Sequence, residues 1–296
     1  MTTRGDATAR AKACFLRACE LDVAVRKPGN VSRASGGHGM QADMFIASAH
    51  AAAGPLFEPG SSVGVRIEAA VTATWAVAGC NTNLGILLLC APIALAVELR
   101  PDALAPSTLR ASIESVLAGL DLSDAQATFR AIARAHPGGL GTAPEQDVHE
   151  PPSVDLRAAM ALAAPRDSIA RQYRDGFADL FDLGLSAALG SGFALGPEGA
   201  FTVTAAVTTA VQRLYLTLLC AFPDSHIVRK HGDGVAQIVM TAAQAWTARA
   251  RSGVPLDNHC EFAAWDESLK ADCINPGTTA DLTVAALLIA GLAGPA

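Results

Sequence analysis

The sequence contains few aromatic and few charged residues. Aromatic side chains make up 5% of its 296 residues, and Asp, Glu, Lys and Arg together make up 17%. A chain with so few aromatic residues does not favour a sheet, whereas its many Ala, Leu and Val residues are typical of helices that pack closely through small side chains. Because 51% of the residues are hydrophobic, the chain can bury a sizeable core and we do not expect disorder. The composition therefore predicts an all-α fold.

No apolar run reaches the roughly 20 residues that a membrane-spanning helix needs. The longest candidate, residues 84–99, contains Pro92 and includes Glu98 near its end, and the apolar tail that starts at residue 282 is shorter. Both segments predict buried helices and no membrane insertion. Residues 1–22 carry charges in every turn and contain no signal-peptide core, so we expect a cytoplasmic location.

Paired cysteines and clusters of basic residues are also missing. The seven cysteines are irregularly spaced and include no C-x-x-C pair, which argues against a disulfide framework and against a zinc knuckle. We expect them to be small buried hydrophobic residues. The net charge of −6, without a Lys/Arg cluster, excludes an extended nucleic-acid surface but allows a local pocket for anions.

Helical spacing of apolar residues recurs along most of the chain and predicts about a dozen helices in a single large bundle, with Gly- and Asn-rich loops at helix N-termini. The expected helices span residues 7–26, 41–53, 62–78, 84–99, 106–118, 123–135, 153–163, 167–189, 198–222, 233–251, 259–272 and 278–293. Residues 136–152, rich in Gly, Pro and acidic side chains, are the main interruption. We interpret them as a long loop within one domain that covers residues 1–296, and a linker between two domains is the alternative.

Four compact polar segments interrupt the apolar pattern, at residues 27–45, 79–96, 224–234 and 275–288. Turn and cap chemistry can explain each segment separately. Three of them, however, place Asn, Thr or Ser together with Gly at the start of an apolar helix. Free backbone N–H groups and the helix dipole can receive phosphate there. Several such helix starts around one cleft would form a site for a phosphorylated small molecule.

The polar segments contain the candidate substrate-binding residues. These are Lys27, Asn30, Ser32, His38, Asn81, Thr82, Asn83, Arg229 and Lys230. Cations are scarce in this chain, so those inside the polar segments are candidates to neutralise an oligophosphate, although an exposed Arg-Lys pair can equally be solvated surface. The spacing of the histidines matches no zinc-binding pattern.

Three carboxylates are candidates for chemistry. Glu68 lies on an otherwise apolar helix, and because an unpaired buried carboxylate is costly, we expect it to pair with Arg66 or to face a cleft. Asp224 and Asp281 lie in polar segments and can hold a hydrated Mg²⁺, which commonly uses one or two carboxylates together with substrate phosphates. Glu68 and Asp224 are therefore the catalytic candidates, Asp224 and Asp281 the metal candidates, and a helix cap is the alternative for Asp281.

Three motifs occur in the same order as in a known family. Lys27-Pro28-Gly29 is followed by Gly37-His38 and by F-x-x-S-A at residues 45–49. Asn81-Thr82 is followed by Gly85, and residues 275–282 read N-P-G-T-T-A-D-L. They resemble the K-P-G loop, the G-x-N-T-H-K-G motif and the C-terminal P-G-G-x-A-D-L of the triphosphoribosyl-dephospho-CoA synthase family. The resemblance covers most of the chain and implies an all-helical transferase that uses ATP.

In the best-known members of that family, the 2′-hydroxyl of dephospho-CoA attacks C1′ of the ATP ribose and expels adenine. This chain departs from the family pattern at two places. Asn83 and Leu84 replace the histidine and lysine that follow N-T, and Gly39-Met40-Gln41 replaces the acidic D-M after the first histidine. The N-T-N-L-G form resembles the branch found in methanogens and methylotrophs, which is linked with one-carbon coenzymes of the methanofuran and methanopterin type.

Three hypotheses follow. The first is a Mg²⁺-dependent transferase in coenzyme biosynthesis that acts on ATP or another phosphorylated substrate by displacement at an activated carbon. The second is a condensing enzyme for a one-carbon carrier coenzyme, methylofuran among them, that uses a diphosphate-activated intermediate and releases pyrophosphate. The third is a non-catalytic binding protein, because the cation and the histidine of the central motif are replaced. An exposed face on so apolar a chain also predicts a homodimer.

Overall fold

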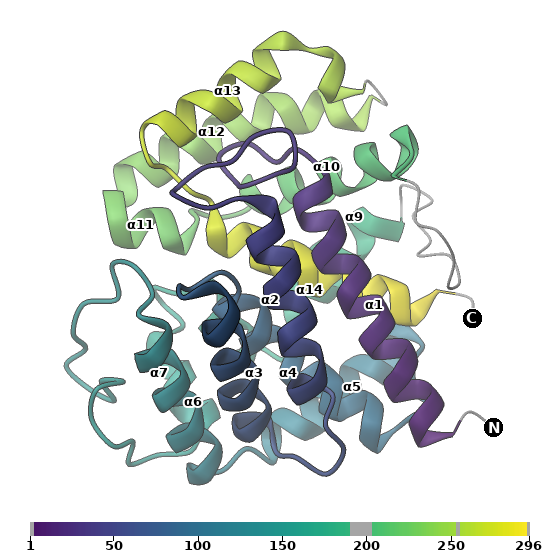
Figure 1. Ribbon diagram of the computed structural model, residues 1–296, viewed down its shortest axis with the longest axis vertical. Coiled ribbons are helices and arrows are strands. Elements are labelled where there is room, and N and C mark those ends of the chain that lie inside the picture. The colour runs from purple at the N-terminus through teal and green to yellow at the C-terminus, as the bar shows by residue number, and fades with distance from the viewer. Residues whose placement is uncertain (1–2, 190–202, 253–254, 295–296) are drawn as a thin grey trace.

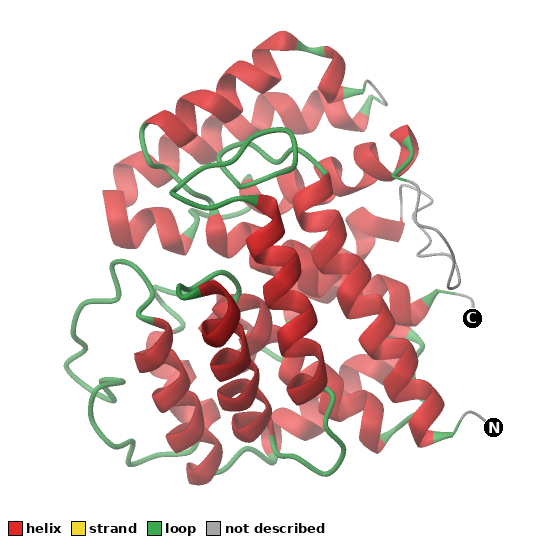
Figure 2. Ribbon diagram, viewed as in Figure 1, coloured by secondary structure: helices red, strands yellow, loops and turns green. Residues whose placement is uncertain are grey.

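The computed structural model describes residues 3–189, 203–252 and 255–294. Within these ranges the chain forms fourteen α-helices and no β-strand (Figures 1 and 2), which confirms the predicted all-α fold. The helices are α1 (Arg4–Ala24), α2 (Ala42–Leu56), α3 (Val63–Ala78), α4 (Leu84–Leu99), α5 (Pro106–Ala118), α6 (Leu122–Ala135), α7 (Leu156–Ala163), α8 (Ser168–Arg174), α9 (Ser186–Leu189), α10 (Ala205–Leu219), α11 (Ser225–His231), α12 (Asp233–Arg251), α13 (Cys260–Ala271) and α14 (Gly277–Ala293). A π-helical segment, η1 (Leu180–Leu185), precedes α9, and a 3₁₀ turn, η2 (Leu256–Asn258), precedes α13.

Most helices begin and end within a few residues of their predicted bounds. The single helix expected over residues 167–189 is wrong, because Gly176 and Phe177 adopt φ values of 63° and 60° and end the helical path after α8. Residues 225–231 form α11, where no helix was predicted. The start of the helix expected from residue 198 lies outside the described residues, and α10 begins at Ala205.

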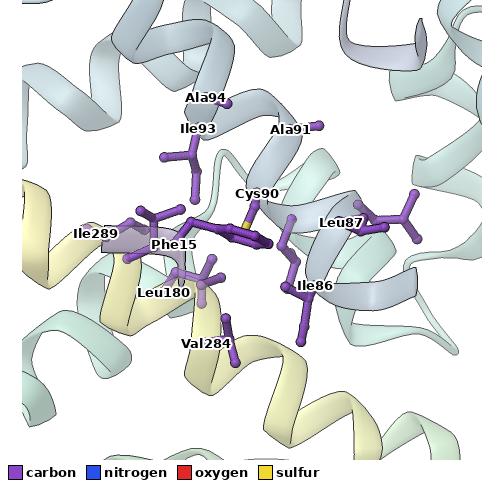
Figure 3. Close-up of a cluster of buried hydrophobic side chains, with 14 of the residues drawn as sticks. Phe15, Ile86, Leu87, Cys90, Ala91, Ile93, Ala94, Leu180, Val284 and Ile289 are labelled. Atoms are coloured by element: carbon purple, nitrogen blue, oxygen red, sulfur yellow. The ribbon is translucent and has the colours of Figure 1, made fainter. Parts of the chain in front are cut away.

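The core is built around α4 and α14, which are buried on nearly all sides. Phe15 of α1, Cys90 of α4 and Val284 of α14 meet at its centre (Figure 3). An apolar sequence on every face of α4 and α14 is therefore explained by burial within the protein. None of the described helices is long and apolar enough to cross a membrane.

A second, smaller hydrophobic cluster joins α10, α12 and α13. Trp246 lies at its edge, where its ring is 5.0 Å from that of Phe262. The N-terminal loop of residues 25–41 passes beside these helices (Figure 1). It is held by Asp266 of α13, whose Oδ1 accepts a hydrogen bond from the N–H of Gly29 at 2.9 Å. Lys270 Nζ bonds both Asp266 Oδ2 and the carbonyl of Ser35, so α13 fixes the loop in place.

No helix is present between Ala135 and Leu156. This loop extends beyond α6 and α7 at the lower left of Figure 1. Its Gly139 adopts a φ of 74° and approaches α11 so closely that a Cβ at this position would lie 2.8 Å from the carbonyl oxygen of Arg229. The loop therefore packs directly against α11.

Candidate functional site

The four polar segments converge on one cavity of about 290 Å³. The first segment contributes Asn30, the second contributes Asn81 to Gly85, and the third contributes Arg229. The fourth contributes Asp281. Helix starts that are far apart in the sequence therefore surround a single space.

The start of α4 presents amide groups to this cavity. Asn81 Oδ1 accepts a hydrogen bond from the N–H of Leu84 at 3.1 Å and so caps the helix. Asn83 occupies the N-cap position but makes no side-chain cap bond. It is 5% exposed, and its Nδ2 has no hydrogen-bond partner among the described residues. Because a buried N–H without a partner is costly, this amide is available to a ligand.

Thr82 connects the first two motifs. Its Oγ1 donates to Ser48 Oγ at 2.7 Å, and Ser48 Oγ in turn donates to the carbonyl of Met44 on α2. Thr82 lines the cavity as well. The F-x-x-S-A motif therefore supports the N-T motif by a direct hydrogen bond.

Four aspartates line the cavity, and two of them, Asp22 and Asp281, are buried in its wall. Lys27 is fully buried, and its Nζ lies 3.0 Å from Asp22 Oδ1. Burial raises the pKa of Asp22, and the charge of Lys27 opposes that rise. Burial raises the pKa of Asp281 well above its usual value, and the nearby Asp22 and Asp224 raise it further. Carboxyl groups with raised pKa values are common where chemistry takes place.

Gly85 makes room for Asp281. A Cβ at this position would lie 2.0 Å from Asp281 Oδ2, far inside van der Waals contact, and 2.6 Å from Ile169 Cδ1. We expect Gly85→Ala to displace Asp281 and to lower kcat/KM at least about tenfold, because small misplacements of site groups have large effects on rate. Steady-state kinetics check this expectation. Gly54→Ala is the matched control, since a Cβ at Gly54 in α2 meets nothing within 4 Å. Equal activity of Gly85→Ala and wild type would contradict the assignment.

Helices α8 and α11 build another part of the cavity wall. Arg229 Nη1 donates to Asp167 Oδ2 at 2.5 Å, and Arg166 is exposed at the rim. His226 also lines the cavity, and its Nε2 has no hydrogen-bond partner among the described residues. Burial, followed by the positive charges of Arg229 and Lys230, lowers the pKa of His226 to about 3. The imidazole is therefore neutral at neutral pH and does not act as a proton donor from an imidazolium form.

Asp224 does not line the cavity. Its Oδ1 accepts the N–H groups of His226 and Ile227 at the start of α11, and its Oδ2 accepts both the N–H and the hydroxyl of Thr279 at the start of α14. Four donors thus occupy a fully buried carboxyl group. The structure places Asp224 as a link between two helix starts and not, as predicted, as a catalytic or metal-binding group.

Glu68 is also outside the cavity. Its two oxygens form a bidentate pair with Arg130 on the surface, at 2.7 Å each. The expected partner, Arg66, is instead fully buried and paired with Glu98. The predicted pairing of Glu68 with Arg66 is wrong. Glu68 lies on the side of α3 that faces solvent beside α6, so its carboxylate is not buried on an apolar helix.

Four further predicted residues do not line the cavity. Lys27 is the counterion of Asp22, and Ser32 is buried in the loop of residues 25–41. His38 bonds the carbonyl of Gly29 through Nε2 at 2.8 Å, and burial lowers the pKa of its imidazole. Lys230 is exposed beside the loop of residues 136–155. The predicted residues that line the cavity are Asn30, Asn81, Thr82, Asn83, Arg229 and Asp281.

The sequence matches the family model for ATP:dephospho-CoA triphosphoribosyl transferase over residues 8–295. The chain belongs to this family. It is accordingly a transferase. A solved structure from Archaeoglobus fulgidus, named as a candidate triphosphoribosyl-dephospho-CoA synthase, shares the fold, with a TM-score of 0.59 and 24% sequence identity over 84% of this chain and 98% of that one. A search of curated proteins found no match.

Three residues at the departures from the family motifs, Met40, Asn83 and Leu84, line the cavity of this family member. Leu84, which stands where the family has a lysine, is 7% exposed and lines the cavity. Arg166 and Arg229 are the cations that line the cavity within the described ranges, and Arg229 is already paired. The cavity wall therefore lacks the lysine of the family motif, and it neutralises less of the negative charge of a phosphorylated substrate.

The cavity suits Mg²⁺ only in part. Among the described residues, no group of three or more His, Cys, Asp or Glu side chains is placed to hold a metal ion. Mg²⁺ bound through substrate phosphates needs only one or two carboxylates, and Asp22 and Asp281 line the cavity. A cation there would also offset the charge repulsion that raises the pKa of Asp281. Asp224 does not fit, because both of its oxygens are occupied.

The sequence interpretation missed Asp22, Arg166 and Asp167, all of which line the cavity. Asp22 carried a usable signal, since it lies between Leu21 and Val23 on a helix whose inner face is apolar. We used the cost of burying a carboxylate as an argument for Glu68, and the same argument is stronger for Asp22. Arg166 and Asp167 carried no such signal, because both lie in a charged turn before α8.

Proposed function

We propose that the chain is a triphosphoribosyl-dephospho-CoA synthase-like transferase that acts on ATP or another phosphorylated substrate in coenzyme biosynthesis. The observation that carries this proposal is the convergence of all three family motifs on one cavity that also contains buried carboxyl groups and arginines. The reaction joins an acceptor hydroxyl to an activated carbon. The new C–O bond forms as the bond to the leaving group breaks, and the leaving group takes the electron pair.

Different residues of the cavity contribute to different parts of this reaction. Arg229 and Arg166 neutralise phosphoryl oxygens, and the amide of Asn83 donates to an oxygen of the substrate. Asp22, held by Lys27, accepts the proton of the acceptor hydroxyl. Asp22 and Asp281 are the residues that would hold Mg²⁺, which supplies positive charge to the phosphates when it is bound.

A second candidate has support from one observation. Because Leu84 replaces a cation on the cavity wall, a substrate with fewer phosphates than ATP is easier to accommodate. This favours the condensation of a diphosphate-activated intermediate in the synthesis of a one-carbon coenzyme such as methylofuran. The reaction would release pyrophosphate and no adenine.

Incubation of the pure protein with ATP, Mg²⁺ and dephospho-CoA tests the first candidate. We expect free adenine, and we expect Asp22→Asn to lower its rate of release at least about 100-fold, since a general base commonly contributes that much. Glu68→Gln is the matched control and should retain near wild-type activity, because Glu68 pairs with Arg130 on the surface. Chromatography of the released base measures both. Absence of adenine with every acceptor tried would reject the first candidate, and pyrophosphate release alone would support the second.

A further inference from the structure

Helix α13 lies outside the cavity. Within the described part of the chain, no residue of α10, α12 or α13 lines the space where the polar segments meet. The loop of residues 25–41 passes beside these helices (Figure 1), and it contributes Asn30 and Met40 to the cavity wall. Contacts between α13 and this loop therefore connect the second hydrophobic cluster to the site.

Asp266 of α13 makes the central contact with this loop. Its side chain is fully buried. Its Oδ1 accepts the N–H of Gly29 at 2.9 Å, and its Oδ2 accepts hydrogen bonds from Arg26 Nη1 at 2.8 Å and from Lys270 Nζ at 2.9 Å. Lys270 Nζ also donates to the carbonyl of Ser35 at 3.2 Å. Asp266 thus holds the loop directly and through Lys270, and hydrogen bonds to a charged group are among the stronger ones in proteins.

The turn that Asp266 holds reaches the cavity at its next residue. Gly29 adopts a φ of 80°, and a Cβ at this position would lie 2.7 Å from Pro276 Cδ before α14. Asn30 follows, lines the cavity, and donates from Nδ2 to Asn275 Oδ1 at 3.1 Å. The turn is therefore packed between α13 and the fourth polar segment, and a shift of Gly29 displaces Asn30 from the wall.

The same turn also determines the position of Lys27. The carbonyl of Pro28 accepts a hydrogen bond from the hydroxyl of Tyr215 on α10 at 2.8 Å. Lys27 is fully buried, and its Nζ lies 3.0 Å from Asp22 Oδ1. Burial raises the pKa of Asp22, and the charge of Lys27 opposes that rise. Asp22 therefore depends on a cation that lies in the turn held by Asp266.

We infer that Asp266 is a positioning residue for the transferase site. It holds the turn of residues 27–30 without touching the substrate. Asn30 thereby stays in the cavity wall, and Lys27 stays beside Asp22. The inference rests on the proposed function in that it takes Asp22 as the base in this cavity. It adds that α13, from outside the cavity, controls the charge balance of that base.

Hydrogen–deuterium exchange of the full chain tests the contact with the loop and needs no substrate. Asp266→Asn should speed exchange of the amides in residues 25–41 about tenfold or more, because the asparagine amide turns an N–H donor towards either Gly29 or the two cations. Exchange in α4 and α14 should be unchanged, which shows an intact core. Loop exchange equal to that of wild type would overturn the inference.

Two further variants complete this measurement. Glu267→Gln is the matched control, because Glu267 is the next residue of α13 and its side chain is 56% exposed, so loop exchange should not change. An equal rise in Glu267→Gln would overturn the inference. If Asp266→Asn does not fold, Asp266→Leu combined with Lys270→Met takes its place. This double variant removes both buried charges of α13, so that neither remains without its partner, and it also removes both contacts with the loop. The same rise in loop exchange is expected, and its absence would overturn the inference.

The pH dependence of kcat/KM distinguishes positioning from a general loss of stability. Adenine release from ATP, with dephospho-CoA as acceptor, should slow on the acid side when Asp22 becomes protonated. Displacement of Lys27 removes the charge that opposes the raised pKa of Asp22, so Asp266→Asn should move this acid limb to higher pH. A smaller folded fraction would lower the rate at every pH without moving the limb. An unmoved limb in Asp266→Asn would therefore reject the positioning role.

The other titratable groups near Asp22 are the same in this variant as in wild type. They are Cys19 on the same helix, Tyr215 on α10 and Asp281 on α14, and burial raises the pKa of each. A shift of the acid limb in Asp266→Asn therefore reports the displacement of Lys27. If the wild-type protein releases no adenine, the proposed function is rejected, and the exchange experiment still decides whether Asp266 holds the loop.

Discussion

Replacing Asp281 by asparagine is expected to lower kcat/KM at least about 100-fold, because it removes a carboxyl group from the wall of the cavity. The same change is expected to leave the fold at least as stable as wild type at neutral pH. Asparagine resembles the protonated carboxyl group in shape, and burial together with Asp22 raises the pKa of Asp281 well above its usual value. Loss of activity with unchanged or increased stability is the pattern of a residue kept for function.

The pH dependence of stability follows from the same raised pKa. The folded protein binds the Asp281 proton more tightly than the unfolded chain does, so the contribution of this group to the free energy of unfolding is greatest at low pH. It falls as the pH rises from the ordinary carboxyl value through the folded-state pKa. Asparagine does not titrate. Thermal unfolding in EDTA should therefore show the variant gaining stability relative to wild type between pH 4.5 and pH 8.5, and a relative loss over that range would contradict the assignment.

Asp224→Asn is expected to lower the free energy of unfolding by about 3 kcal/mol, because a buried carboxyl group with four donors cannot be replaced by an amide without loss. The amide oxygen can still cap α11. The amide nitrogen, however, would face the N–H of Thr279, another donor. Urea denaturation measures the change, and it should appear as a lower midpoint with an unchanged slope.

Asp155→Asn is the control for this change, since it alters an exposed N-cap on α7 and should have a much smaller effect on stability. The two possible roles of Asp224 give opposite results. A catalytic or metal-binding aspartate would lose activity while the protein kept its stability. An aspartate that links α11 to α14 loses stability first, and any activity that remains in the folded fraction has a near wild-type rate.

The sequence predicted the helices well because local signals define them. Apolar spacing, Pro106 at the start of α5 and Gly79 in a left-handed conformation after α3 are all readable from the chain. Helix α11 was missed because its polar and basic residues resemble those of a loop. Its signal was Asp224, which has the side chain expected of an N-cap, but we assigned that residue to chemistry.

The sequence identified the four polar segments, but their meeting around one cavity is a property of the tertiary fold. The choice among carboxylates required tertiary partners that no local pattern reveals, such as Arg130 for Glu68 and Thr279 for Asp224. The orienting partner of Arg229 was hidden for the same reason, since Asp167 is 62 residues away in the chain.

The contacts of Lys27 and Thr82 have a consequence for how such sequences are assigned to reactions. Both are prominent letters of the motifs, yet Lys27 neutralises Asp22 and Thr82 donates to Ser48, so each binds the protein itself. A motif whose residues mostly contact the protein itself indicates the structure of a binding site and gives little information about its ligand. A chain can therefore keep these motif residues while its substrate changes. The residues to compare between such enzymes are those that line the cavity and have unpaired polar atoms, here Asn83, His226 and Arg229.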